Sequence, residues 1–305
     1  MAFRRSRRSG FIVCILAYLT AIFVCYLFGS VFYGSNVILY AFVLAILATV
    51  TIFLISMLVN NSSIFDPYWS LAPPAIFLYW IFEGKPVEGN IIRQSIIIGL
   101  VIFWSIRLTW NWIRRWQGLI DEDWRYRNFR KKYPSSYWLV SFSGIHLFPS
   151  LVIFVACISV YPALMMRSPA LNIIDLIAGI VALAGIIIET TADQQLRKHL
   201  RKGREQPFLS EGLWKYSRHP NYFGEVLFWI GLCIFSLSSD TLLWWIFPGP
   251  VIMLLLFFFV SVPMTDKRML QRRRGYREYY KKTSGLIPWF IKKSITHNEG
   301  FRPDS

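Results

Sequence analysis

The sequence predicts an all-α membrane protein, a polytopic helical bundle that crosses a bilayer about seven or eight times. Hydropathy supports this class: runs of about 20 apolar residues recur from one end of the chain to the other, and 55% of the residues are hydrophobic. The placement of charge supports it as well. Of the 33 Lys and Arg residues, 29 fall in four segments that lie between or beyond the apolar runs.

The apolar runs define eight expected spans. The first two contain only apolar and small polar residues, which is typical of a scaffold. The later spans carry the polar residues that are discussed below. The spans cover residues 11–29, 37–59, 68–82, 91–112, 147–166, 171–190, 221–238 and 241–262.

The basic segments indicate how the chain is oriented. They cover residues 1–10, 113–146, 191–218 and 263–305. With eight spans and a cytoplasmic N-terminus, all four face the cytoplasm, where Lys and Arg are in excess in membrane proteins. This accounts for the net charge of +16 without a nucleic-acid partner. We therefore expect both termini in the cytoplasm, in the endoplasmic reticulum membrane of a eukaryote or the inner membrane of a bacterium.

The four cysteines indicate neither disulfides nor a metal site. Cys14, Cys25, Cys157 and Cys233 fall within expected spans, and no CxxC or Cys/His spacing occurs. We interpret them as small apolar core residues and expect no metal. The basic N-terminus before the first apolar run is typical of an uncleaved signal-anchor.

Polar residues single out two places in the first half of the chain. Asp66 precedes Pro67 and Tyr68, so it caps a helix start, or Asp66 and Tyr68 face an internal cavity. Arg107 and Asn111 lie four residues apart on one face of the fourth span. Snorkelling towards headgroups is the alternative for Arg107.

The end of the sixth span carries charges of both signs. Glu189, Asp193 and Arg197 follow one another at i, i+4 and i+8 on a single helix. The like charges of Glu189 and Asp193 destabilise a bare helix. Arg197 offsets this, as would the hydroxyl groups of a bound ribose, which carboxylates commonly bind in cofactor sites.

The most informative stretch reads EGLWKYSRHPNYFGEVLFWIG. Arg218 and His219 come directly before Pro220, which suits the first turn of the apolar helix that follows. Backbone dipoles and cationic side chains there favour an anion, with anchoring at headgroups as the alternative. Asn221 and Glu225 lie four residues apart on one helical face. A carboxylate in an apolar helix marks a candidate functional site.

Several motifs resemble the steroid 5-alpha reductase C-terminal family of membrane proteins, and an uncharacterised subfamily within it most closely. They are ADQQL at 192–196, GLWKYSRHPNYFGE at 212–225 and RRRGYREYYKKTSGLIP at 272–288. Asp66-Pro67-Tyr68-Trp69 and the RL..N..R pattern from Arg107 extend the resemblance over most of the chain after residue 60. It implies a reductase-like catalytic domain at 61–293, between a scaffold at 1–60 and a disordered tail at 294–305.

The resemblance also implies a cofactor and its contacts. The C-terminal helices and cytoplasmic loops would hold NADPH, with its phosphates at the cytoplasmic mouth. Asn221 and Glu225 would hold the nicotinamide end, and Asp193 and Arg197 would contact the nucleotide. The phosphates would meet Arg218, His219, Arg268 and Arg272, and Glu189, Tyr222 and Tyr276 complete the expected cofactor set.

The expected function is NADPH-dependent reduction of a carbon–carbon double bond conjugated to a carbonyl in a lipid or sterol. Asp66, Tyr68, Arg107 and Asn111 are the candidates for the acid or donor that polarises the carbonyl, and Glu225 is a further catalytic candidate. The Arg-His-Pro element is also similar to that of isoprenylcysteine carboxyl methyltransferases, so methyl transfer from S-adenosylmethionine is an alternative. A lipid-binding membrane protein without catalysis is another.

The charge distribution yields a testable topology. A cysteine introduced at Ser210, in a basic segment, should react with a membrane-impermeant maleimide only after the membrane of intact cells is opened. A cysteine at Gly89, between the expected third and fourth spans, should react from outside. Labelling of the Ser210 position in intact cells would overturn the topology.

Overall fold

A computed structural model describes residues 6–29, 36–84, 89–167, 169–201, 207–239 and 243–290. Every regular element in these ranges is a helix, which confirms the expected all-α class. A backbone pairing outside the helices joins Ser217 to Ser284. The tail at 294–305, expected to be disordered, lies outside the described residues.

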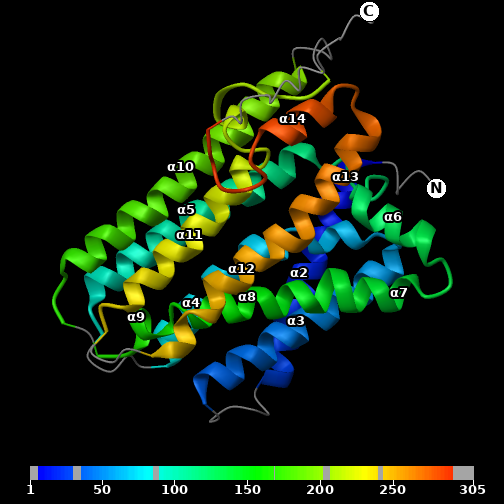
Figure 1. The fold of residues 1–305 in the computed structure, drawn as a ribbon. Coiled ribbons are helices and arrows are strands. Elements are labelled where there is room, and N and C mark those ends of the chain that lie inside the picture. Colours follow the sequence, from blue (N-terminus) through cyan, green and yellow to red (C-terminus); the bar gives the residue numbers. More distant parts are fainter. Residues whose placement is uncertain are drawn as a thin grey trace, which may run out of the picture. The chain divides into compact units, whose positions relative to one another are not determined.

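Figure 1 shows the helices, coloured in the order of the chain. The first half contains α2 (Arg7–Gly29), α3 (Val37–Val59), α4 (Tyr68–Glu83), α5 (Ile91–Arg115), α6 (Trp124–Lys132), α7 (Tyr137–Val140), α8 (Phe148–Ile158) and α9 (Tyr161–Met165). The second half contains α10 (Ile173–Arg201), α11 (Pro220–Ser236), α12 (Pro248–Leu256), α13 (Val262–Arg272) and α14 (Tyr276–Lys282). Short 3₁₀ turns occur at Ser62–Phe65, Gly212–Lys215 and Trp244–Ile246, and π-helical segments at Ser141–Leu147 and Phe257–Ser261.

Six stretches of the described chain are long and apolar enough to cross a bilayer, as a multi-pass membrane protein requires. The expected spans at 68–82 and 221–238 form α4 and α11, of 16 and 17 residues, below the roughly 20 that a hydrocarbon core needs. The six stretches are Arg7–Gly29, Val37–Val59, Ile91–Arg115, Tyr137–Ile158, Ile173–Arg201 and Trp244–Arg272.

One expected boundary was wrong. Residues 137–146 were assigned to a cytoplasmic loop, whereas they form a helix that continues into α8. The π-helical segment carries His146 into the interior, where its ring lies 4.5 Å from that of Phe65. Most of residues 137–146 are apolar, and the apolar stretch long enough to cross a bilayer runs from Tyr137 to Ile158.

The chain divides into two compact units. Unit 1 comprises Met1–Leu183 and Trp229–Met253, and unit 2 comprises Ala184–Phe228 and Leu254–Ser305. All residues of the expected cofactor set belong to unit 2, whereas Asp66, Tyr68, Arg107 and Asn111 belong to unit 1. The expected domain limits at 60 and 293 stay predictions.

Within unit 1, α4 runs from one end of the bundle to the other. Near its start, the hydroxyls of Ser70 and Thr109 lie 2.7 Å apart, beside the last turns of α5. Near its end, Trp80 packs edge-on against Tyr161 with ring centroids 5.1 Å apart. The helix is continuous through Pro73 and Pro74, and its 16 residues compare with 25 in α5.

A buried ion pair joins α5 to α10. Arg93 donates to the two carboxylate oxygens of Asp175 at 2.6 and 2.9 Å, and both side chains are buried. Arg93 also donates to the Pro169 carbonyl at 3.3 Å. Loss of one partner from such a pair costs about 3–5 kcal/mol, so this contact fixes the start of both helices.

Glycines bring α10 and α11 into close contact within unit 2. A Cβ on Gly185 would lie 2.5 Å from the Phe228 nitrogen and 2.6 Å from the Gly224 oxygen. A Cβ on Gly224 would lie 2.7 Å from the Gly185 oxygen and 2.8 Å from the Cβ of Glu189. Only residues without a side chain permit this approach, which brings Glu189 against α11.

Gly185→Ala should therefore destabilise the protein by about 1–3 kcal/mol, because a methyl group added to a close-packed contact forces the helices apart. The measurement is thermal unfolding in detergent by circular dichroism. Gly99→Ala is the matched control, because a Cβ there meets no atom within 4 Å. That variant should be stabilised by about 0.5–1 kcal/mol through the helix propensity of Ala. Equal shifts in both variants would contradict the close contact.

Candidate functional site

The turn before α11 is fastened to the C-terminal segment of unit 2. The backbone N–H of Arg218 donates to the Ser284 carbonyl at 2.8 Å, and the Ser217 hydroxyl donates to the Leu286 carbonyl at 2.7 Å. The N–H of Trp289 donates to the Tyr216 carbonyl at 3.0 Å. Pro220 then begins α11, as its position in the sequence predicted.

Arg218 lies at the centre of this attachment. Its guanidinium donates from Nε and Nη2 to one oxygen of Asp266, at 3.2 and 2.8 Å. Its Nη1 donates to the carbonyls of Tyr280 and Thr283, at 2.6 and 2.7 Å. Four of the five N–H groups that an Arg offers are thus committed inside the protein, and Asp266 balances the charge.

Asp266 accepts two further hydrogen bonds, both at its Oδ1. His219 Nε2 lies 3.1 Å from that oxygen, and the Tyr276 hydroxyl donates to it at 2.6 Å. A carboxylate only accepts, so His219 carries a proton on Nε2. Burial, followed by the hydrogen bond to Asp266, raises the pKa of Tyr276 above its usual value. Asp266 is the sole acid among residues 244–272, the signal by which sequence reasoning could have paired it with Arg218.

Aromatic rings extend this cluster along α11. The His219 and Tyr222 rings stack with centroids 5.2 Å apart, and Tyr222 stacks in turn on Phe257 at 4.9 Å. The Arg218 guanidinium lies 4.0 Å from the centroid of the Tyr280 ring. The Arg-His-Pro turn is therefore held in one conformation by stacking as well as by charge.

Next to this cluster, α10 and α11 bring together four of the expected cofactor residues. The approach at Gly185 and Gly224 sets Glu189 and Asp193 on α10 beside α11, and the side chains of Glu189 and Glu225 are buried. The Asn221 amide nitrogen donates to Asp193 at 3.5 Å. Because a carboxylate cannot donate, this contact directs the amide oxygen of Asn221 away from Asp193.

The Oδ1 of Asn221 is buried and has no hydrogen-bond partner among the described residues. Leaving such an acceptor unmatched costs about 1–3 kcal/mol. A ligand that donates an amide N–H would satisfy it. This atom is the clearest sign of a binding site in unit 2.

Three other cations of the expected set have more contact with solvent than Arg218. Arg197 on α10 and Arg268 on α13 are half-buried, and Arg272 at the end of α13 is exposed. Their side chains are therefore less buried than that of Arg218.

The four candidates in unit 1 occupy one end of that unit. Tyr68 is buried and donates to the Ala45 carbonyl of α3 at 3.1 Å. Asp66 accepts a hydrogen bond from the Tyr126 hydroxyl of α6 at 2.7 Å. Arg107 and Asn111 are half-buried on α5. The contact between Ser70 and Thr109 places the beginning of α4 next to this part of α5.

Asp66 predicts a specific pH dependence. Burial, and then the neighbouring Asp123 carboxylate, raises the pKa of Asp66 to about 7. The folded protein thus holds this proton up to about pH 7, whereas the unfolded chain releases it near pH 4. Stability should fall as pH rises between these values, by up to about 1.4 kcal/mol per pH unit.

The check is the melting temperature of wild type and Asp66→Asn between pH 5 and 8. The Asn side chain of this variant can still accept a hydrogen bond from Tyr126. Its melting temperature should fall much less with rising pH than that of wild type. Asp121→Asn removes a half-buried carboxylate from the loop between α5 and α6. This variant should show the same fall of the melting temperature as wild type. Parallel curves for wild type and Asp66→Asn would refute the assignment.

Comparisons with known proteins complete the description. An uncharacterized protein of Schizosaccharomyces pombe is 27% identical over 285 residues, which cover 86% of this chain and 82% of that protein. No solved structure matches the chain. The family described as "Protein of unknown function (DUF1295)" matches residues 52–283, from within α3 to the end of α14. The match covers every candidate site residue from Asp66 to Tyr276, and the chain belongs to the DUF1295 family.

Proposed function

We propose that this protein is a membrane-embedded reductase that uses NADPH to reduce a carbon–carbon double bond conjugated to a carbonyl in a lipid or sterol. The observation that carries the proposal is the buried, unmatched Oδ1 of Asn221. It lies on the same helical face as the buried carboxylate of Glu225, directly after the Arg-His-Pro turn. The resemblance of this stretch to the steroid 5-alpha reductase C-terminal family supports the same reading.

The hydrogen-bond acceptors in unit 2 suit a nicotinamide. A carboxamide NH₂ can donate to both the Asn221 oxygen and the Glu225 carboxylate, while Asp193 keeps Asn221 correctly oriented. Bound NADPH would supply the hydride. Asp193 and Glu189 are suited to ribose hydroxyls, which carboxylates commonly bind.

The cations divide into two roles. Arg197 and Arg272 are less buried than Arg218 and are assigned to the phosphates together with Arg268, and their charge would favour NADPH over NADH because of the additional phosphate. Arg218 is committed to Asp266 and to two carbonyls. We assign to Arg218 and His219 the positioning of the turn, so that the first N–H groups of α11 point to the anion.

The expected acid or donor for the substrate carbonyl stays among the candidates that the sequence named. Asp66 suits the role through its pKa of about 7, which keeps part of the population protonated at neutral pH. Tyr68, Arg107 and Asn111 are the alternative donors, and Glu225 remains the catalytic candidate of unit 2.

The proposal includes the topology. We place both termini in the cytoplasm, with α4 and α11 crossing in addition to the six longer stretches. The contacts of α4 with Thr109 near its start and with Tyr161 near its end support its crossing. Eight crossings also put 29 of the 33 Lys and Arg residues on one side, as the excess of positive charge in cytoplasmic loops requires.

Asn221→Ala should weaken NADPH binding by roughly 1–3 kcal/mol, which is about five- to 150-fold in the dissociation constant, because the carboxamide loses a buried partner. The measurement is a titration of the detergent-solubilised protein that follows NADPH fluorescence. Asn128→Ala, at an exposed position on α6, is the matched control and should bind as wild type does.

Three outcomes would contradict the proposal in whole or in part. Equal NADPH affinity in wild type and Asn221→Ala would remove Asn221 from the site. Binding of S-adenosylmethionine in place of NADPH would indicate a methyltransferase. Binding of neither by a protein that melts cooperatively would indicate a lipid-binding protein without this chemistry.

A further inference from the structure

A second feature of the chain, independent of the proposed reductase site, lies at the end of unit 1 that contains α6. The exposed cations there include Arg114 at the end of α5, and Arg127, Lys131 and Lys132 on α6. None of them has an ion-pair partner within the described residues. We call this group the α6 surface.

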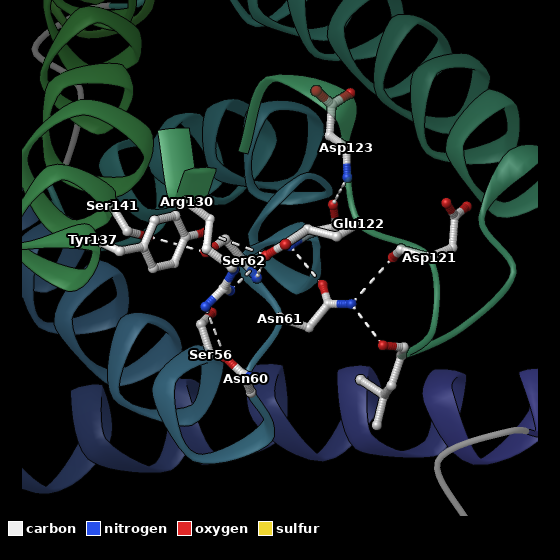
Figure 2. Close-up of polar contacts among 12 residues, drawn as sticks. Ser56, Asn60, Asn61, Ser62, Asp121, Glu122, Asp123, Arg130, Tyr137 and Ser141 are labelled. Atoms are coloured by element: carbon white, nitrogen blue, oxygen red, sulfur yellow. Dashed lines mark hydrogen bonds and ion pairs between the residues drawn. The ribbon is translucent and has the colours of Figure 1, made fainter. Parts of the chain in front are cut away.

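The acids of the same region are turned inward. Oε1 of Glu122 accepts from the Ser62 backbone N–H at 3.0 Å, from Arg130 at 3.1 Å and from the Tyr137 hydroxyl at 3.2 Å (Figure 2). Asp123 caps α6 and pairs with Arg125 at 2.8 Å. Asp121, Glu122 and Asp123 are all half-buried and each accepts a hydrogen bond from the protein, whereas the four cations are exposed.

Hydrogen bonds from the turn after α3 hold the loop in place (Figure 2). The Asn61 amide donates to the carbonyls of Leu119 and Asp121 at 3.0 and 3.1 Å. Arg130 donates to the Asn60 side chain at 2.9 Å, and the Asp123 N–H donates to the Ser63 hydroxyl at 2.8 Å. A surface ordered in advance loses little conformational entropy when it binds a ligand.

Aromatic side chains accompany the cations. The Arg114 guanidinium lies 4.8 Å from the centroid of the Trp110 ring, and the Lys132 ammonium lies 5.0 Å from that of Tyr133. Trp110 and Tyr133 are 50% and 36% exposed, and both residue types favour the interface between hydrocarbon and headgroups. This combination suits a ligand with a charged phosphate and an apolar tail.

We propose that the α6 surface binds the phosphate headgroups of anionic phospholipids and selects them over zwitterionic ones. The cations supply the attraction, because each Lys or Arg near an anionic bilayer adds to binding. The ion pairs of Glu122 with Arg130 and of Asp123 with Arg125 reduce the competing negative charge. Trp110 and Tyr133 place the surface at headgroup depth.

The test measures lipid selectivity of the full chain in phosphatidylcholine vesicles that contain spin-labelled phosphatidylglycerol or phosphatidylcholine. Electron spin resonance gives the relative association of each lipid with the protein. We expect wild type to prefer phosphatidylglycerol. Salt at about 0.5 M should weaken this preference, because it screens the charges. Arg127→Gln, Lys131→Gln and Lys132→Gln together should reduce it about tenfold.

The matched control removes the same charge from unit 2, through Lys267→Gln, Arg274→Gln and Arg277→Gln at exposed positions. It should retain the wild-type preference. Equal loss in both triple variants would show that net charge alone attracts the lipid, and an unchanged preference in the α6 variant would exclude the surface. Both outcomes overturn the proposal, and equal melting temperatures establish that all three proteins are folded.

Discussion

Burying a charge among apolar groups costs several kcal/mol unless an opposite charge and hydrogen bonds meet it, and much of the described structure follows from this constraint. In unit 2, the Asp266 carboxylate meets Arg218, His219 and Tyr276 at once. Arg218 then extends the attachment to the carbonyls of Tyr280 and Thr283. One carboxylate thereby holds α13, α14 and the turn before α11 in register.

The candidate site beside that turn depends on packing of a different kind. Gly185 and Gly224 let the backbones of α10 and α11 approach so closely that a methyl group on either would clash. This approach brings Asp193 to the amide of Asn221 and thereby orients its oxygen. A polar group whose orientation is set by one partner, and whose other end is buried without one, is a pre-formed acceptor for a ligand. The proposed function therefore depends on the absence of two side chains as much as on the presence of others.

In unit 1, too, charged side chains in the interior are paired, and two groups of residues show this. In one group, Arg93 and Asp175 neutralise each other in the interior. In the other group, Glu122 accepts hydrogen bonds from Arg130, from Tyr137 and from the backbone N–H of Ser62. The acids of the loop before α6 pair with Arg125 and Arg130, whereas the exposed Arg127, Lys131 and Lys132 of the same helix have no ion pair within the described residues. The pairing that stabilises the loop thus also determines the charge of its surface.

The sequence by itself determined what depends on neighbours within one or two turns. Apolar runs determined the all-α class, Pro220 determined where α11 begins, and the spacing of Asn221 and Glu225 placed both on one face of that helix. The motif from Arg218 to Glu225 carried the expectation of a cofactor site, and the family match spans it.

Only the tertiary structure decided which distant groups meet. Arg218 was expected at a phosphate, whereas its guanidinium points to Asp266, 48 residues further along the chain. Arg93 and Glu122 attracted no attention in the sequence, and their partners lie 82 and 60 residues away. Helical periodicity is encoded locally, but the partner of a buried charge depends on how separate helices pack, and no local pattern specifies that packing.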